Sequence, residues 1–513
     1  MPQEVELKLN PDKAFDELYI RNELARQLKI ELTQIKAVKY LRRSIDARKK
    51  PIYLLRVKVY QIHEAIEDDL KGFDLRKQTL KKRIAIIGFG PAGMFAALQL
   101  IENGYLPIVI ERGKTVKDRR RDLAALNKEL QVNPESNYCF GEGGAGTYSD
   151  GKLYTRSKKR GNVLKVLQTF VDHGADQDIL VNAHPHIGTN KLPGIIENIR
   201  EHILEFGGEI HFNSKLTNFK TIENKISSIE INGAKEMEVD AVILATGHSA
   251  RDIFELLHSK QIEIEAKPFA LGARIEHPQE LIDQIQYKVQ DRGEYLPPAS
   301  YSMVTQAAGN GVFSFCMCPG GIIAPAATDT KEVVVNGWSP SKRNGRFANS
   351  GMVVTVNPEH WQKNYGEGPL AALNLQKQIE FAAFEVNKSI VAPAQRMVDF
   401  IRNKHSGDLP ECSYIPGVSA YNLHDILPKF IGRSLAEGLS HFGKSAKGYL
   451  SDQAILVGVE SRTSSPVRIP RNKENFRHVQ IENLFPCGEG AGYAGGIVSA
   501  ALDGMACAEV VAL

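Results

Sequence analysis

The 513-residue sequence has few of the features that mark membrane or disulfide-stabilised secreted proteins. No uninterrupted apolar run approaches the about 18 residues that a membrane-spanning helix needs. The first ten residues, MPQEVELKLN, lack the apolar centre of a signal peptide. Six cysteines are too few for a disulfide framework in a chain of this length, so reduced thiols are expected. These absences predict a cytoplasmic protein without a membrane span.

The charge is nearly balanced, at a formal net +4, but it is spread unevenly. Residues 1–82 hold 19 Lys and Arg against 13 Asp and Glu, and the excess is greatest in LRRSIDARKK at 41–50. A basic stretch of this kind can bind nucleic acid. It lacks the interleaved aromatic residues of a base-stacking surface, which favours the alternative of a solvated hairpin face.

Residues 83–112 carry the strongest pattern in the sequence. An apolar, β-branched run at 83–87 predicts a buried strand, and residues 94–103 predict a helix that Gly104 ends. A second buried strand is predicted at 106–110, and Glu111 follows it directly. Between the first strand and the helix, GFGPAG at 88–93 fits G-x-G-x-x-G. This order predicts a dinucleotide site, against the alternative of a plain glycine-rich turn in an α/β protein.

Each glycine of this turn has a physical task. Gly88 makes the tight turn, Gly90 lets a pyrophosphate approach bare backbone, and Gly93 lets the helix and strand pack closely. The phosphates would lie at the helix N-terminus, where free N–H groups and the macrodipole favour anions. Glu111 lies eighteen residues after Gly93, where a carboxylate can accept the ribose hydroxyls.

Three later stretches are also rich in small residues. GEGGAG at 141–146 repeats the glycine spacing without a buried strand before it, so the whole of 137–153 predicts a packed loop that can approach a flat ligand. DAVILATG at 240–247 predicts a buried strand with a small-residue end. Residues 483–504 predict a short strand, a glycine turn and an apolar helix that begins near Gly496. Strand tips of one sheet would bring these stretches to the same cofactor.

The chain is predicted to have four parts. Residues 1–80 form a small α+β module in β-α-β-β order, half of a ferredoxin-like unit, with a polar linker at 62–78. Residues 81–265 form the first part of the dinucleotide-binding domain and include a charged surface helix at 114–130. Residues 266–450 form an inserted, sheet-based substrate domain, and residues 451–513 complete the dinucleotide-binding domain.

GFGPAG with Glu111, GGAGTYSDGKL, VILATG and LFPCGEGAGYAGGIVSAALDG, in this order, resemble the FAD-containing two-dinucleotide-binding flavoproteins of the glutathione-reductase superfamily. Within it, the chain resembles bacterial FAD-dependent dehydrogenases described as NAD(FAD)-utilizing. The resemblance covers the whole chain, including FCMCPGG at 315–321 and ESRTSSPVRIPR at 460–471. It implies FAD as the cofactor and an α/β fold, in which a mixed-sheet substrate domain interrupts a Rossmann-like, three-layer ββα FAD-binding domain.

The resemblance also implies which residues hold FAD. The pyrophosphate would contact Gly88, Gly90, Pro91, Ala92 and Gly93, and the adenosine ribose would contact Glu111, with Arg112 beside it. The flavin side would be lined by Gly143, Gly144, Ala145, Gly146 and Thr147, and the adenosine-side phosphates by Ala245, Thr246 and Gly247. Gly488 and Glu489 replace the more usual Gly-Asp near the ribityl chain or pyrophosphate, with a carboxylate one methylene further out. Gly496 and Ile497 would face the pyrimidine end of the flavin.

Two pairs of side chains are candidates for the chemistry. Cys316 and Cys318 could relay electrons beside a flavin, although disulfide enzymes of this superfamily use C-x4-C or C-x2-C; packing in the core or a loop is the alternative. Arg462 and Arg468 could clamp an anionic substrate or stabilise the reduced flavin, with structural ion pairing as the alternative.

Three histidines are weaker candidates. His184 and His186 flank a proline and could serve as an acid/base or metal pair, but such residues are more often part of a turn. No cysteine or carboxylate completes a metal shell around them, so no metal is predicted. His248 directly follows the Thr246-Gly247 turn.

The sequence therefore predicts an FAD-dependent oxidoreductase, a dehydrogenase in which the flavin accepts or donates a hydride. The expected partners are a small-molecule substrate, anionic if the arginines bind it, and NADH or NADPH as a transient electron donor. The sequence assigns neither a catalytic acid or base nor an oligomeric state. Two alternatives stay open: a flavoenzyme that modifies RNA, with residues 1–80 as its docking arm, and a non-catalytic flavin-binding sensor.

Overall fold

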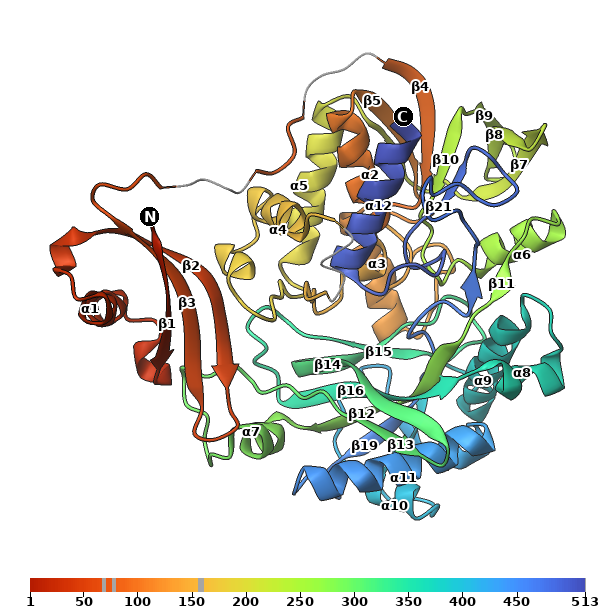
Figure 1. Cartoon of the computed structure of the whole chain (residues 1–513). Coiled ribbons are helices and arrows are strands. Elements are labelled where there is room, and N and C mark those ends of the chain that lie inside the picture. The colour runs from red at the N-terminus through yellow and green to blue at the C-terminus, as the bar shows by residue number, and fades with distance from the viewer. Residues whose placement is uncertain (67–70, 76–79, 156–160, 513) are drawn as a thin grey trace.

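Two large sheets and a small N-terminal module make up the computed structural model (Figure 1). The structure describes residues 1–66, 71–75, 80–155 and 161–512. Part of the linker predicted at 62–78 therefore lies outside the described residues. The fold is mixed α/β, as the sequence predicts.

The N-terminal module follows the predicted β-α-β-β order. Its elements are β1 (Gln3–Leu9), α1 (Glu17–Leu28), β2 (Ile35–Asp46) and β3 (Ile52–Gln61), and its antiparallel sheet has the order β1-β3-β2. Arg43 on β2 joins the module to the rest of the chain. Its backbone N–H donates to the Val181 carbonyl at 2.9 Å, and its guanidinium donates to Asp178 at 2.9 Å.

A five-stranded parallel sheet forms the frame of the predicted dinucleotide domain. Its strands, in spatial order, are β21 (Leu484–Pro486), β10 (Ala241–Leu244), β4 (Leu80–Ile87), β5 (Tyr105–Ile110) and β6 (Glu209–His211). All neighbours run parallel, although β21 comes from the far C-terminal end of the chain. This is the Rossmann-like sheet that the glycine motif predicts.

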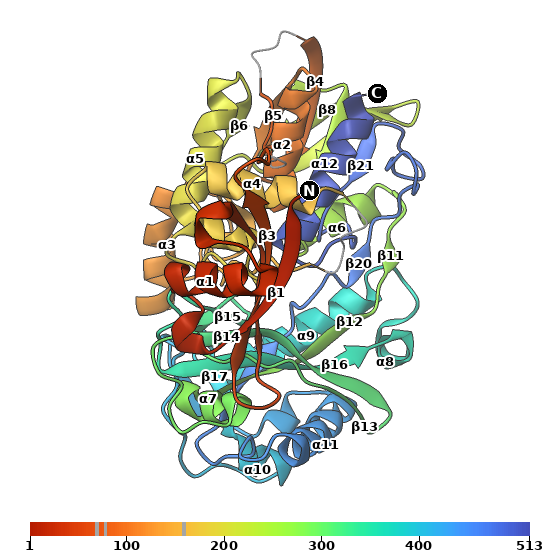
Figure 2. The ribbon, with the colours of Figure 1, turned by 60° about the vertical axis from the view of Figure 1, so that its left-hand side comes forward.

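Alternate residues of this sheet face two different layers. Ile84 and Ile86 pack with helices on one face: α2 (Pro91–Glu102), α4 (Val163–Asp172), α5 (Leu192–Glu205) and α12 (Ile497–Ala512). Ala85 and Ile87 pack on the other face with α6 (Arg251–Ser259) and with a three-stranded antiparallel sheet of β7 (Leu216–Ile222), β8 (Lys225–Ile231) and β9 (Lys235–Glu238). Both views show α12 beside α2 (Figures 1 and 2).

The second large sheet has eight strands. Seven follow the order β13 (Val304–Ala307), β14 (Asn310–Pro325), β16 (Phe347–Val356), β12 (Phe269–Pro278), β19 (Ile455–Glu460), β17 (Ala392–Arg396) and β18 (Val418–Ala420), and β15 (Val335–Trp338) pairs with β14. Its helices are α7 (Gln279–Tyr287), α8 (Pro358–Tyr365), α9 (Ala371–Asn387), α10 (Met397–Ile401) and α11 (Lys429–Ser445). β11 (Glu265–Ala266) pairs with β20 (Val467–Arg468). Since β19 belongs to this sheet, the sheet extends past residue 450, where the insertion was predicted to end.

The charged helix predicted at 114–130 is α3 (Val116–Lys128), but it is not purely a surface helix. Val116, Arg119, Leu123 and Leu126 are buried on one side, and Arg119 is 0% exposed. The prediction was wrong for Arg119 because a charged residue within a charged run is normally solvated, whereas this guanidinium is surrounded by carbonyl oxygens.

Membrane insertion has no candidate helix in the described ranges. Among residues 1–66, 71–75, 80–155 and 161–512, none of the helices has the length and apolar character that crossing a bilayer requires.

Candidate functional site

The carboxyl ends of the parallel strands open onto one cavity of about 400 Å³. Its lining includes the residues that directly follow β4, β5 and β10, namely Gly88, Glu111 and Ala245. Cys316 of β14 and Asn336 of β15 line it from the eight-stranded sheet. The cavity thus lies where ligands bind in open α/β sheets, and a second sheet supplies part of its wall.

Most of the predicted site residues meet in this cavity. The lining contains Gly88, Gly90, Pro91, Ala92, Glu111, Arg112, Gly144, Ala145, Gly146, Ala245, Thr246, Gly247, Glu489, Gly496 and Ile497, together with Cys316, Arg462 and His248. The predicted residues outside the lining are Gly93, Gly143, Thr147, Gly488, Cys318, Arg468, His184 and His186. Contact of each residue with the cofactor stays a prediction.

The first glycine loop has the backbone geometry that its sequence predicts. Gly88 adopts φ +101°, and its N–H donates to the Ile110 carbonyl at 2.8 Å. A Cβ at Gly93 would lie 2.0 Å from the Gly88 oxygen, so the helix can approach this turn only without a side chain there. A Cβ at Gly90, the N-cap of α2, would instead lie 3.9 Å from the Gly144 Cα, an ordinary contact distance.

Glu111 connects the first glycine loop, residues 88–93, to the second glycine loop, residues 141–146. Its Oε2 accepts from the Phe89 N–H at 2.8 Å, and its Oε1 accepts from the Gly113 and Gly141 N–H groups, both at 2.9 Å. The Gly143 N–H also donates to the Phe89 carbonyl at 2.9 Å. Because a carboxylate oxygen accepts two hydrogen bonds, one position on Oε2 is left for a ribose hydroxyl.

Arg119 fixes the conformation of the second glycine loop through hydrogen bonds to carbonyl groups of residues 137–144. Its Nε donates to the Asn137 carbonyl at 2.7 Å, and its two Nη atoms donate to the carbonyls of Tyr138, Glu142 and Gly144, each at 2.9 Å. Nη1 also lies 3.2 Å from Thr147 Oγ1. Thr147 and Arg119 therefore shape the loop from behind, while Gly144–Gly146 face the cavity.

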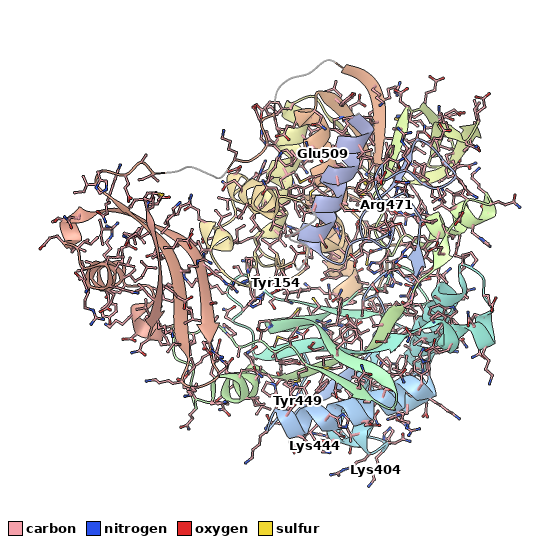
Figure 3. All side chains as sticks on the ribbon, in the orientation of Figure 1. Tyr154, Lys404, Lys444, Tyr449, Arg471 and Glu509 are labelled. Atoms are coloured by element: carbon pink, nitrogen blue, oxygen red, sulfur yellow. The ribbon has the colours of Figure 1, made fainter. Side chains whose placement is uncertain are left out.

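Charged and sulfur-containing side chains gather at the edge where the loop after Gly146 meets β14. The Lys152 Nζ lies 3.6 Å from the sulfurs of both Cys316 and Cys318, and 3.5 Å from Asp150 Oδ2. Burial opposes the charge of Lys152, but the neighbouring cysteine sulfurs and Asp150 outweigh it and raise the pKa of Lys152. Tyr154, which also lines the cavity, lies between the two sheets (Figure 3).

An acid and a histidine occupy another part of the lining. His248 Nδ1 lies 3.6 Å from Glu489 Oε1. Burial raises the pKa of Glu489 to about 7, against the effect of Lys267. Burial, reinforced by Arg462 and Arg251, lowers the pKa of His248 to about 3. His248 is therefore neutral at pH 7, whereas the pKa of Glu489 lies near neutral pH.

The two predicted arginines have different surroundings. Arg462 donates to Thr328 Oγ1 at 2.7 Å and to Glu380 Oε2 at 3.0 Å, and it also pairs with Glu332. These contacts favour the structural ion-pairing alternative for Arg462. Arg468 is exposed outside the cavity lining, 5.9 Å from the Tyr493 ring centroid.

The two histidines around Pro185 have separate partners. His186 Nε2 lies 3.0 Å from the Ser341 carbonyl, and the His184 ring lies 5.0 Å from the Tyr154 ring. Within the described residues, one group with metal-ligand types lies close together, Cys487, Asp503 and Cys507, and Arg471 donates to the last two of them. The guanidinium thus already supplies a positive charge beside two of these three groups.

Sequence reasoning missed Arg119 and gave no role to Lys152. The signal for Lys152 was its position, since Asp150 and Lys152 are the charged residues of SDGKL directly after a glycine-rich loop. No local signal marks Arg119, because the carbonyls that surround it come from residues 137–144.

The lining fits the FAD that the resemblance implies. Gly247, Gly495 and Gly496 line the cavity with no protein atom within 4 Å of where a Cβ would lie. With Gly90, they leave bare backbone on several sides of the space, as the close approach of a pyrophosphate requires. α2 and α12 both begin at this cavity, and their free N–H groups favour an anion.

Comparison with known proteins gives a family and a full-length relative. Residues 268–463 match the family described as "FAD-dependent protein, C-terminal domain-like", and residues 1–60 match a domain of unknown function. A protein of Clostridium beijerinckii (strain ATCC 51743 / NCIMB 8052), described as uncharacterized, is 40% identical over 511 residues. The match covers 96% of this chain and 95% of that protein.

Solved structures show only distant similarity. A geranylgeranyl bacteriochlorophyll reductase-like protein from Thermoplasma acidophilum is 12% identical, with 84% of this chain and 77% of that chain covered and a TM-score of 0.35. CtdE in complex with FAD is 11% identical, with 83% and 82% covered and a TM-score of 0.32. The open conformation of a flavocytochrome c3 fumarate reductase is 10% identical, with 85% and 78% covered and a TM-score of 0.33. These similarities are too distant to indicate a shared reaction.

Proposed function

The chain belongs to the same family as the Clostridium beijerinckii protein, its cofactor is FAD, and from this premise we propose that it is an FAD-dependent oxidoreductase. One observation carries the proposal: a single cavity joins the dinucleotide loop and Glu111 to Lys152 and Cys316. When bound, FAD supplies the centre that takes up and gives back electrons. The protein supplies binding, orientation and charge around it.

The first glycine loop and Glu111 would hold the nucleotide end of FAD. Gly90 and the free N–H groups at the start of α2 would bind the pyrophosphate, and Oε2 of Glu111 would accept a ribose hydroxyl. Arg112 lies 4.4 Å from the Phe140 ring centroid and pairs with Asp252, and both Arg112 and Phe140 line the cavity. Arg112 and Phe140 therefore support placing the adenosine end of FAD at their side of the cavity.

The start of α12 would face the other end of the cofactor. Gly496 and Ile497 line the cavity, and the Ala500 N–H is the one that donates back to the Gly496 carbonyl, at 2.9 Å. The N–H groups of Ile497, Val498 and Ser499 precede this first intrahelical bond and have no carbonyl of α12 four residues before them to donate to. A helix N-terminus in this position would stabilise negative charge on a reduced flavin.

We assign the finer type, a dehydrogenase of the NAD(FAD)-utilizing kind with a small-molecule substrate, from the sequence resemblance. NADH or NADPH is then the expected electron donor. Lys152, whose side chain is 36% exposed beside the cavity, supports an anionic substrate more directly than Arg462, whose nitrogen atoms already donate to acceptors in the protein.

A visible absorption spectrum tests the proposal. The purified protein should show an oxidised flavin spectrum, and NADH or NADPH should bleach it under anaerobic conditions. Gly90→Ala is the matched variant, since the new Cβ would lie 3.9 Å from the Gly144 Cα, an ordinary contact, but would block the pyrophosphate. If the wild-type protein shows no flavin spectrum, even after addition of FAD, the proposal is wrong.

The two alternatives make different predictions. An RNA-modifying flavoenzyme would bind tRNA in a salt-sensitive manner and lose this binding when residues 1–80 are deleted. A flavin-binding sensor would keep its flavin oxidised with NADH, NADPH and dye acceptors under anaerobic conditions. Bleaching by either nicotinamide nucleotide, with no tRNA binding, supports the small-molecule oxidoreductase over both.

A further inference from the structure

Cys316 lies at an irregular point of β14. The register with β16 moves from Phe315 opposite Gly351 to Cys318 opposite Asn349, so β14 contains an extra residue there. Cys316 adopts φ +45°, a left-handed conformation that non-glycine residues rarely occupy. Bulges and left-handed residues of this kind direct side chains at functional sites.

The bulge is held in place by a buried arginine. Arg274 is 0% exposed, and its Nη2 donates to the Cys316 carbonyl at 2.8 Å. The same guanidinium pairs with Glu460 at 2.8 Å and donates to Asn349 Oδ1 at 2.8 Å. A Cβ at Gly337 would lie 2.4 Å from Arg274 Nη2, so this glycine leaves room for the guanidinium.

The two sulfurs occupy different positions relative to the cavity. Cys316 is partly exposed and lines the cavity, whereas Cys318 is buried behind it. Both lie 3.6 Å from the Lys152 ammonium, and Cys318 also lies 3.6 Å from Arg274 Nη2. Cys316 is thus the sulfur that a bound cofactor or substrate can reach, and Cys318 is its inner neighbour.

The charges at this corner favour one thiolate. The two neighbouring carboxylates are each paired with an arginine. Glu460 pairs with Arg274, and Asp150 lies 2.6 Å from Arg343 but 3.5 Å from Lys152. A hydrogen bond from Cys318 and the Lys152 ammonium lower the pKa of Cys316, against the effect of burial. The pKa of Cys318 is raised by the same hydrogen bond and by burial. Of the two sulfurs, Cys316 therefore has the lower pKa.

The bulge decides whether these two cysteines can come close enough for a bridge. Two residues of extended chain span about 6.6–7.2 Å. Disulfides usually span about 4.4–6.8 Å between Cα atoms. Cys316 is left-handed and lies within a bulge, so the chain here is shorter than its fully extended length, which brings the two cysteines toward the range of a disulfide.

We propose that Cys316 and Cys318 form a dithiol–disulfide couple that exchanges an electron pair with FAD in the cavity. The inference rests on the proposed function, because FAD is the redox partner. In the oxidising direction, an S–S bond forms between the two sulfurs and the S–H bond of Cys318 breaks. Oxidised FAD takes up the electron pair and the proton, and the reverse step restores the thiolate and the thiol.

An anaerobic dithionite titration tests the couple. The FAD-loaded protein is oxidised with diamide, desalted and titrated, and the electrons taken up per FAD are counted. The wild type should take up four electrons, two for FAD and two for the disulfide. Cys316→Ser and Cys318→Ser should take up two, and the control Cys412→Ser, a cysteine outside the cavity lining, should take up four.

Thiol counts in denaturant give a second readout. The wild type has six cysteines, so its free thiols should rise from four after diamide to six after reduction. This rise should be absent in both single serine variants. If the wild type takes up two electrons per FAD, or if the rise persists in Cys316→Ser, the couple does not exist and the proposed function still stands. If the protein binds no FAD, the proposed function is wrong and this step with it.

Discussion

Replacement of Arg119 by Met tests whether one buried guanidinium shapes the cofactor loop. Arg119 donates to four backbone carbonyls and one hydroxyl of residues 137–147, and none of these acceptors is a carboxylate. Met keeps the length of the aliphatic chain and removes all of these hydrogen bonds. We expect the loop to lose the conformation in which Glu111 accepts from Gly141 and Gly143 donates to Phe89.

The expected magnitude follows from the hydrogen bonds and the burial. A hydrogen bond from a charged donor contributes about 1.5–3 kcal/mol, and breaking a buried charged network costs about 3–5 kcal/mol. We take about 3 kcal/mol, the lower end of that range, because burial lowers the pKa of Arg119 and Met removes this desolvation cost. If the loop conformation that binds FAD loses about 3 kcal/mol of stability, the Kd for FAD should rise about 100-fold.

The assay is a titration of apoprotein with FAD, followed by flavin fluorescence, with thermal unfolding of the same samples. Arg121→Met is the matched control, since Arg121 is an exposed residue of the same helix. A Kd for Arg119→Met within about threefold of wild type, less than 1 kcal/mol, would refute the reasoning. An equal loss in Arg121→Met would assign the effect to the helix rather than to the guanidinium.

Three further predictions address the glycine loop, the cysteine corner and the acid in the lining. Gly93→Ala should lower the melting temperature of the apoprotein because its Cβ would lie 2.0 Å from the Gly88 oxygen, whereas Gly90→Ala should leave it unchanged and weaken FAD binding; an equal loss of stability in both would contradict this. Lys152→Met should raise the pKa of the Cys316 thiol by at least about one unit, so the midpoint of the pH profile of iodoacetamide alkylation moves to higher pH by that amount, while Lys152→Arg keeps the midpoint. Burial raises the pKa of Glu489 to about 7 from its ordinary 4.5, so the folded protein binds a proton that the unfolded chain has released, and stability falls as pH rises between these values. Glu489→Gln should reduce this fall in apoprotein melting temperatures without abolishing it, because burial also raises the pKa of Glu276 and of Glu460 to about 7; an unchanged slope would show that Glu489 does not contribute.

Local patterns were enough to predict the parallel sheet and its glycine loop. A buried strand, a G-x-G-x-x-G turn and a helix lie next to one another along residues 83–103, so the sequence order already contains their spatial order. Gly88 and Gly93 have the predicted tasks because both depend on neighbours within a few residues. The family resemblance implied that residues 144–146, 245–247 and 496–497 contact the same cofactor. In the structure, all of them line one cavity.

The remaining features depend on contacts between distant segments. The role of Cys316 needs the bulge against β16, the guanidinium of Arg274 and the ammonium of Lys152, which come from three separate parts of the chain. The interpretation of Arg462 as an anion clamp or an ion-pairing residue could not be decided without Glu332 and Glu380, which lie more than 80 residues away. Spacing along the sequence carries no information about such partners.

The position of β21 has a consequence for how the protein is made. β10 pairs with β4 on one side and with β21 on the other, and roughly 240 residues separate β10 from β21. At about 5–20 residues per second, the ribosome needs about 12–50 s to supply them. During that time the edge of β10 and the face of α2 that α12 covers have no partner from their own chain. The nascent chain is therefore exposed to aggregation in this interval, and the FAD cavity is completed only once β21 and α12 have been synthesised.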